Sequence, residues 1–67
     1  MKIQLNGRMI DFEQENGTIY DLLATYKLED RVVIVEKNHE IIDKQAFRAT
    51  EIKPNDIIEI VHFVGGG

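Results

Sequence analysis

The sequence contains no cysteine and no serine among its 67 residues. Without cysteine, neither a disulfide framework nor a thiolate metal site can hold so short a chain together. A hydrophobic core must do so instead, and a chain of this length buries only about 60% of the surface that its unfolded form exposes. The composition is 43% hydrophobic and 30% charged, which is typical of globular proteins. We therefore expect one small, simple domain.

Basic residues and long apolar runs are also scarce. Eight basic side chains stand against twelve acidic ones, giving a net charge of −4. Nucleic acids and anionic membranes are bound through clustered Lys and Arg, so the charge argues against both partners. The longest aliphatic run, 32–35, is far too short to span a membrane, and residues 1–5 alternate instead of forming a signal-peptide core. These features predict a cytoplasmic protein.

The chain is poor in groups that could carry chemistry. Its threonines have no histidine close in sequence to act as a base, and His39 and His62 lie 23 positions apart, without the spacing of a zinc site. Gly7 and Gly17 stand alone, so no glycine-rich loop is present to hold a phosphate. We expect no catalytic residue, no metal and no bound cofactor.

Hydrophobic alternation at the N-terminus predicts a β-hairpin. Apolar residues alternate with polar ones on both sides of Asn6-Gly7. This dipeptide favours a type I′ turn, because both central residues of that turn need positive φ. We expect strands at 2–6 and 8–13, followed by a polar loop at 14–17.

A helix is predicted next. Thr18 and Asp21 have the spacing of a capping box. An apolar stripe with helical spacing follows and should pack on the sheet; it consists of Ile19, Leu22, Leu23 and Tyr26. We expect residues 28–31 to end the helix.

The second half of the chain reads as three strands. The β-branched run 32–35 predicts a central strand buried on both faces, or nearly so. A short strand at 41–42, a helical turn within 43–50 and a turn at 53–56 should precede a last strand at 57–64. The element order favours an α+β fold in which one helix crosses a mixed sheet of four to five strands, with the first and last strands as neighbours.

The last strand alternates between two faces. We assign Ile58 and Ile60 to the core, which leaves Val61 and Phe63 as exposed apolar residues near the C-terminus. The apolar pattern stops at Val64, and three glycines follow.

These glycines predict a flexible C-terminal tail, residues 65–67. Fully extended, three residues reach about 10 Å, and the absence of side chains lets them enter a narrow channel. The α-carboxylate of Gly67 is ionised at neutral pH and is a poor electrophile. It could donate an acyl group only after activation, for example as an acyl adenylate made by a partner enzyme. Ordering the tail would cost on the order of 3 to 6 kcal/mol, and one buried apolar side chain returns roughly 1.5 to 3 kcal/mol, so more than one anchor is needed.

The sequence resembles the ThiS family, small sulfur carriers of thiamine-thiazole biosynthesis that have the ubiquitin-like β-grasp fold. The resemblance covers essentially the whole chain, so that residues 1–67 would form a single β-grasp domain. Besides the N-terminal hairpin, it rests on the segments Gly17-Thr18-Ile19-Tyr20-Asp21-Leu22-Leu23, Val33-Ile34-Val35-Glu36-Lys37-Asn38, Asp56-Ile57-Ile58-Glu59-Ile60-Val61 and Val64-Gly65-Gly66-Gly67. The last of these segments is the most specific.

The resemblance implies a function for the C-terminus. A ThiF-like enzyme would use ATP to adenylate Gly67, and sulfur from a cysteine persulfide, supplied by a donor such as a cysteine desulfurase, would convert the carboxylate to a thiocarboxylate. Thiazole synthase, ThiG, would then take the sulfur. Gly65 and Gly66 would act as the tail spacer. Val61, Phe63 and Val64 are our candidates for binding partner enzymes.

Three other functions remain open at this point. The small subunit of molybdopterin synthase resembles the chain in fold, tail and thiocarboxylate chemistry. A ubiquitin-like modifier would instead link its tail to lysines of other proteins. A β-grasp binding module with an incidental glycine tail would keep its function without Gly67.

Overall fold

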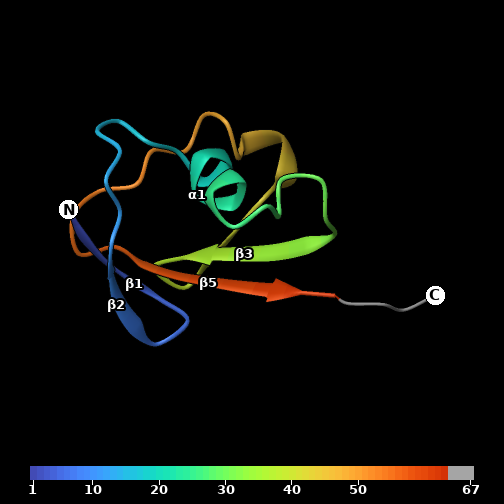
Figure 1. The fold of residues 1–67 in the computed structure, drawn as a ribbon. Helices are drawn as coiled ribbons and strands as arrows, with labels where there is room; N and C mark the ends of the chain where they lie inside the picture. The colour runs from blue at the N-terminus through green and yellow to red at the C-terminus, as the bar shows by residue number, and fades with distance from the viewer. Residues whose placement is uncertain (64–67) are drawn as a thin grey trace.

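The computed structural model describes residues 1–63, arranged as a five-stranded sheet with one α-helix and a short 3₁₀ helix (Figure 1). The predicted last strand, 57–64, is observed from Ile57 to His62, and Phe63 lies just beyond it. Val64 and the predicted tail, 65–67, lie outside the described residues. In chain order the elements are β1 (Lys2–Leu5), β2 (Arg8–Asp11), α1 (Ile19–Thr25), β3 (Val33–Lys37), β4 (Glu40–Ile42), η1 (Lys44–Ala46) and β5 (Ile57–His62).

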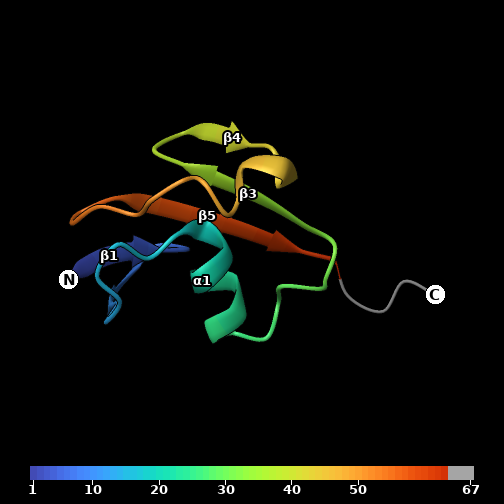
Figure 2. The ribbon, with the colours of Figure 1, turned by 90° about the horizontal axis from the view of Figure 1, so that it is seen from above.

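The strand order is β2-β1-β5-β3-β4, and the sheet is mixed. β5 pairs in parallel with β1 and antiparallel with β3, so it occupies the centre of the sheet. The two outer pairs, β1 with β2 and β3 with β4, are antiparallel. Figure 2 shows the long β5 lying between β3 and β1. The predicted α+β fold, with the first and last strands as neighbours, is confirmed.

Tight turns join both hairpins. Asn6 and Gly7 have φ values of 49° and 84°, and Leu5 pairs with Arg8 across them, as a type I′ turn requires. Asn38 and His39 repeat this conformation between β3 and β4, with φ values of 51° and 72°. The predicted turn at 53–56 also forms, since the Asp56 amide donates to the Lys53 carbonyl at 3.1 Å.

The start of α1 was predicted correctly, whereas its end was not. Both hydrogen bonds of the Thr18–Asp21 capping box are present. The helix nevertheless ends at Thr25, before the predicted 28–31. Lys27 has a φ of 61°, its amide donates to Ala24, and the Leu28 amide donates to the Leu23 carbonyl at 2.8 Å. This is a Schellman motif with lysine in the position that glycine usually occupies, so the sequence carries no obvious stop signal.

The core lies between α1 and one face of the sheet. α1 and η1 lie on the same side of β3 and β5 (Figure 1). Ten hydrophobic residues are buried there, namely Ile3, Phe12, Ile19, Leu22, Leu23, Val35, Phe47, Ile52, Ile58 and Ile60. Tyr26, which was assigned to the buried stripe, is 46% exposed because the helix ends before it.

The prediction that 32–35 is a central strand buried on both faces is wrong. β5 occupies the central position, and β3 lies between it and β4. Val35 faces α1 and is fully buried, whereas Ile34 points to the opposite face and is 42% exposed; Val32 precedes the strand and is 73% exposed. In the described part of the chain the helices cover one face of the sheet only, so alternate residues of an apolar run remain open to solvent.

Candidate functional site

The C-terminal half of β5 presents apolar side chains on the face of the sheet that α1 does not cover. Val61 is 52% and Phe63 54% exposed, whereas Ile58 and Ile60 are buried beneath α1. The predicted division of β5 into two faces is therefore confirmed. Val61 and Phe63 thus lie at the end of the described chain, and in the sequence only Val64 separates Phe63 from the predicted tail.

Two neighbours from the β3 side complete this surface. Ile34 lies directly opposite Val61 in the β3–β5 ladder, and the Phe63 amide donates to the Val32 carbonyl at 3.3 Å. We call Val32, Ile34, Val61 and Phe63 the open-face patch. Val32 and Ile34 were not predicted as site residues, because their run was expected to be buried. Recognising that the helices cover only one face of the sheet would have identified them.

Polar contacts fix the start of β5. Asp56 is 8% exposed, and its carboxylate accepts hydrogen bonds from the Lys53 amide at 2.8 Å and from Asn38 Nδ2 at 3.0 Å. The Lys37 ammonium lies 3.8 Å from the same carboxylate. Asn38 Oδ1 in turn accepts from the Ile57 amide at 2.9 Å. The network ties the 53–56 turn to the β3–β4 turn and sets the direction in which β5 leaves.

A side-chain amide supports β5 further along, where β1 has ended. Asn6 Oδ1 accepts from the Ile60 amide at 2.8 Å, and Asn6 Nδ2 donates to the Ile60 carbonyl at 3.3 Å. The Asn6 side chain therefore continues the β1 ladder by one position. β5 is supported on both edges up to Ile60, and this support holds Val61 and Phe63 in place on the open face.

The two histidines do not form a metal site. His39 lies exposed in the β3–β4 turn, and His62 points toward the covered face of the sheet, opposite Val33. Within residues 1–63, His62 Nε2 is buried without a hydrogen-bond partner, as is Glu29 Oε2. No group of three or more potential metal ligands occurs among these residues.

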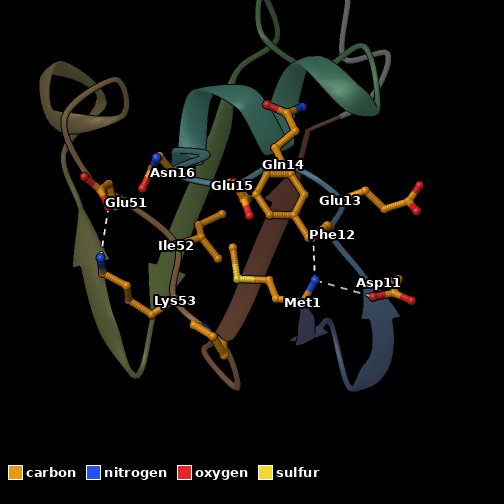
Figure 3. Close-up of a pocket in the computed structure, with 11 residues that line it drawn as sticks. Met1, Asp11, Phe12, Glu13, Gln14, Glu15, Asn16, Glu51, Ile52 and Lys53 are labelled. Atoms are coloured by element: carbon orange, nitrogen blue, oxygen red, sulfur yellow. Dashed lines mark hydrogen bonds and ion pairs between the residues drawn. The ribbon is translucent and has the colours of Figure 1, made fainter.

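A pocket of about 610 Å³ lies beside the N-terminus (Figure 3). The Met1 ammonium donates to the Phe12 carbonyl at 3.0 Å and lies 3.6 Å from Asp11 Oδ1. The Lys2 ammonium, hydrogen-bonded to Asp11, lowers the pKa of that carboxyl. β1 and β5 run in parallel, so this pocket lies at the end of the sheet where β5 begins, away from the open-face patch. Its lining holds acidic side chains, the Met1 ammonium and Lys53 but no hydroxyl or thiol side chain, and no sequence pattern indicated the pocket.

The remaining predicted site residues, Val64, Gly65, Gly66 and Gly67, lie outside the described residues. Their assigned functions stay predictions. The structure describes the chain up to these residues, which is a strand hydrogen-bonded on both edges with an apolar patch at its end. None of the helices within 1–63 is long and apolar enough to cross a membrane.

A mixed sheet with parallel first and last strands and one helix across it defines the class of ubiquitin-like β-grasp proteins. Within that class, the sequence model of the ThiS family matches residues 3–67. The chain belongs to the ThiS family.

Curated relatives and solved structures agree with this family. The chain is 54% identical to the sulfur carrier protein ThiS of Bacillus subtilis, over 97% of this chain and 98% of that protein. The crystal structure of a thiamine biosynthesis protein (ThiS) from Geobacter metallireducens aligns with this protein over the full length of both chains, with a TM-score of 0.82 and 32% sequence identity.

A different kind of relative is a thiazole synthase. The thiazole synthase of Paramagnetospirillum magneticum is 36% identical over the whole of this chain, which matches 20% of that protein's length. A thiazole synthase of Magnetococcus marinus gives the same identity and coverage. A segment similar to this chain therefore forms part of those longer proteins.

Proposed function

We propose that this protein is a sulfur carrier for thiazole formation in thiamine biosynthesis, with Gly67 as the residue that carries the sulfur. The observation that carries the proposal is the whole-length similarity to a sulfur carrier protein ThiS. The chain would act as a co-substrate of partner enzymes and not as an enzyme, in keeping with its lack of cysteine and serine.

The chemistry begins with activation of the Gly67 carboxylate. A carboxylate oxygen attacks the α-phosphorus of ATP, pyrophosphate leaves, and an acyl adenylate results. ATP would be bound by a ThiF-like activating enzyme, and the carrier itself would bind no cofactor. Because ATP is an intracellular substrate, we place the reaction in the cytoplasm.

Sulfur then replaces AMP. The terminal sulfur of a cysteine persulfide, supplied through a cysteine desulfurase, attacks the acyl carbon, and AMP leaves. The product is an acyl disulfide, because persulfide sulfur is more oxidised than the sulfur of a thiocarboxylate. A second thiol must therefore supply two electrons, which releases the thiocarboxylate and leaves a disulfide on the donor side.

Thiazole synthase, ThiG, is the proposed acceptor of the sulfur. The two thiazole synthases that contain a segment similar to this chain support this assignment. Gly65 and Gly66 would form the spacer that enters the active site of each partner. The open-face patch would provide the docking contacts, together with Val64.

Mass spectrometry after incubation with ATP, the activating enzyme and a persulfide donor tests the proposal. The expected product is about 16 Da heavier than the unreacted chain, because one oxygen atom is exchanged for sulfur. The added mass should lie in the C-terminal peptide that contains Gly67. Deletion of Gly67, or Gly66→Phe, should abolish the reaction and leave thermal stability unchanged, because the described core ends before these residues.

Several outcomes would contradict the proposal. An adduct that forms without ATP, or that maps to an internal residue, excludes acyl adenylate chemistry at the C-terminus. Attachment of the chain to lysines of other proteins indicates a ubiquitin-like modifier. A thiocarboxylate that supports molybdopterin formation and not thiazole formation would keep Gly67 as the carrier and change the pathway.

A further inference from the structure

Two glutamates face each other on the open face of the sheet. Glu36 on β3 lies directly opposite Glu59 on β5. The ladder bonds from Phe63 to Val32 and from Asn38 to Ile57 place this pair at a hydrogen-bonded position of the ladder, because such positions alternate along antiparallel strands. At those positions the two Cα atoms are about 5.5 Å apart and the side chains project from the same face.

No cation of the described residues neutralises this pair. The four ion pairs within residues 1–63 involve neither Glu36 nor Glu59. Along the strands the nearest residues on the same face are Ile34 and Val61 on one side, and Ile57 and Asn38 on the other. Asn38 is uncharged, and its side-chain amide is already hydrogen-bonded to Asp56 and to the Ile57 amide. Ile41 lies opposite Glu36 on β4 and is 69% exposed.

Like charges directly opposite each other destabilise a sheet, and an opposite charge at either position would stabilise it. The arrangement therefore costs folding stability, and no ion pair within the described chain offsets that cost. A cationic group supplied from outside would do so. The acidic pair is continuous with the open-face patch, which gives one surface with two negative charges at its centre and apolar side chains at the C-terminal end of β5.

We propose that Glu36 and Glu59 together receive a basic side chain, an arginine or a lysine, from the activating enzyme when the open-face patch docks on it. The inference rests on the proposed function and specifies the partner's surface. The activating enzyme must bind the polyphosphate of ATP, so its positive potential attracts an acidic carrier. Glu59 lies eight residues before Gly67, so its Cα atom is at most about 29 Å from that of Gly67.

Binding of the activating enzyme to wild type and to Glu36→Gln/Glu59→Gln, measured by titration calorimetry at about 50 mM and about 500 mM salt, tests the inference. At low salt the double variant should bind about tenfold more weakly, and at high salt the difference should shrink. The thermal midpoint should stay the same or rise, because the repulsion is removed. Glu59→Lys should raise the midpoint further and weaken binding more.

Glu40→Gln is the matched control. Glu40 is exposed on β4 and pairs with Lys37 on the covered side of the sheet, so the same charge change there should leave affinity unaltered. Equal affinity of wild type and double variant at low salt would overturn the inference. So would a lowered thermal midpoint of the double variant, or weakened binding to thiazole synthase alone.

The reaction of the wild-type chain separates the two proposals. If wild type gains no sulfur in the presence of the activating enzyme, the proposed function and this inference both fail. If wild type reacts and the double variant binds and reacts equally well at low salt, the carrier function stands and only the acidic docking site is refuted.

Discussion

Phe63 offers the most direct test of the open-face patch. Its side chain is 54% exposed on the uncovered face of the sheet, so about half of its surface remains available to a partner. Full burial of a phenylalanine is worth roughly 1.5 to 3 kcal/mol, so docking should gain about 0.8 to 1.6 kcal/mol from this residue. Phe63→Ala should therefore raise the Kd for the activating enzyme about 4- to 15-fold.

Affinity and stability should respond differently to this change. Phe63 is the last described residue and packs outside the core, so Phe63→Ala should shift the unfolding temperature only slightly. Titration calorimetry gives the affinity, and circular dichroism gives the unfolding temperature. Met9→Ala is the control, since Met9 is 59% exposed but lies on β2, two strands away from β5; its affinity should match that of wild type.

Two results would refute this reasoning. Unchanged affinity of both Phe63→Ala and the more disruptive Phe63→Glu would show that Phe63 is not an anchor. A large loss of stability in Phe63→Ala would show that the side chain supports the core. The same double measurement on Ile34→Ala would then show whether the β3 half of the patch contacts the partner without Phe63.

Two further predictions concern the support of the sheet. Asn6→Ala should lower the free energy of unfolding, measured in urea titrations, by about 2 kcal/mol, because Ile60 loses two hydrogen bonds and alanine is strained at the positive φ of this position. Glycine tolerates that φ, so Asn6→Gly should lower the free energy of unfolding by about half as much. Equal losses in the two variants would contradict this assignment. Gly17→Ala should destabilise the fold by about 1 to 3 kcal/mol, because the new Cβ would lie 2.6 Å from the buried ring of Phe12. Thermal unfolding measures this loss of stability. An unchanged unfolding midpoint would show that the ring can move aside.

Local sequence patterns determined most of the elements. The Asn6-Gly7 turn needs positive φ at two adjacent residues, and few dipeptides tolerate that conformation, so the hairpin could be read directly. The capping box at Thr18 is equally local. The alternation within β5 predicted which side chains are buried, because a strand projects successive residues to opposite faces.

Other features depended on contacts between distant segments. The end of α1 lies in a Schellman motif whose left-handed residue is Lys27. Glycine is the residue usually found at this position, so the lysine does not indicate the helix end in the sequence. The exposure of Ile34 depends on the number of faces that the helices cover, which a run of β-branched residues does not reveal.

The sequence by itself therefore determined the α+β class, the Asn6-Gly7 turn, the start of α1 and the apolar face at the end of β5, because each follows from a preference of neighbouring residues. Only the tertiary structure decided that β5 is central, that Asn6 supports it 54 residues away, and that Glu36 meets Glu59. These features follow from strand order and register, which arise when one face of the whole sheet is buried beneath α1.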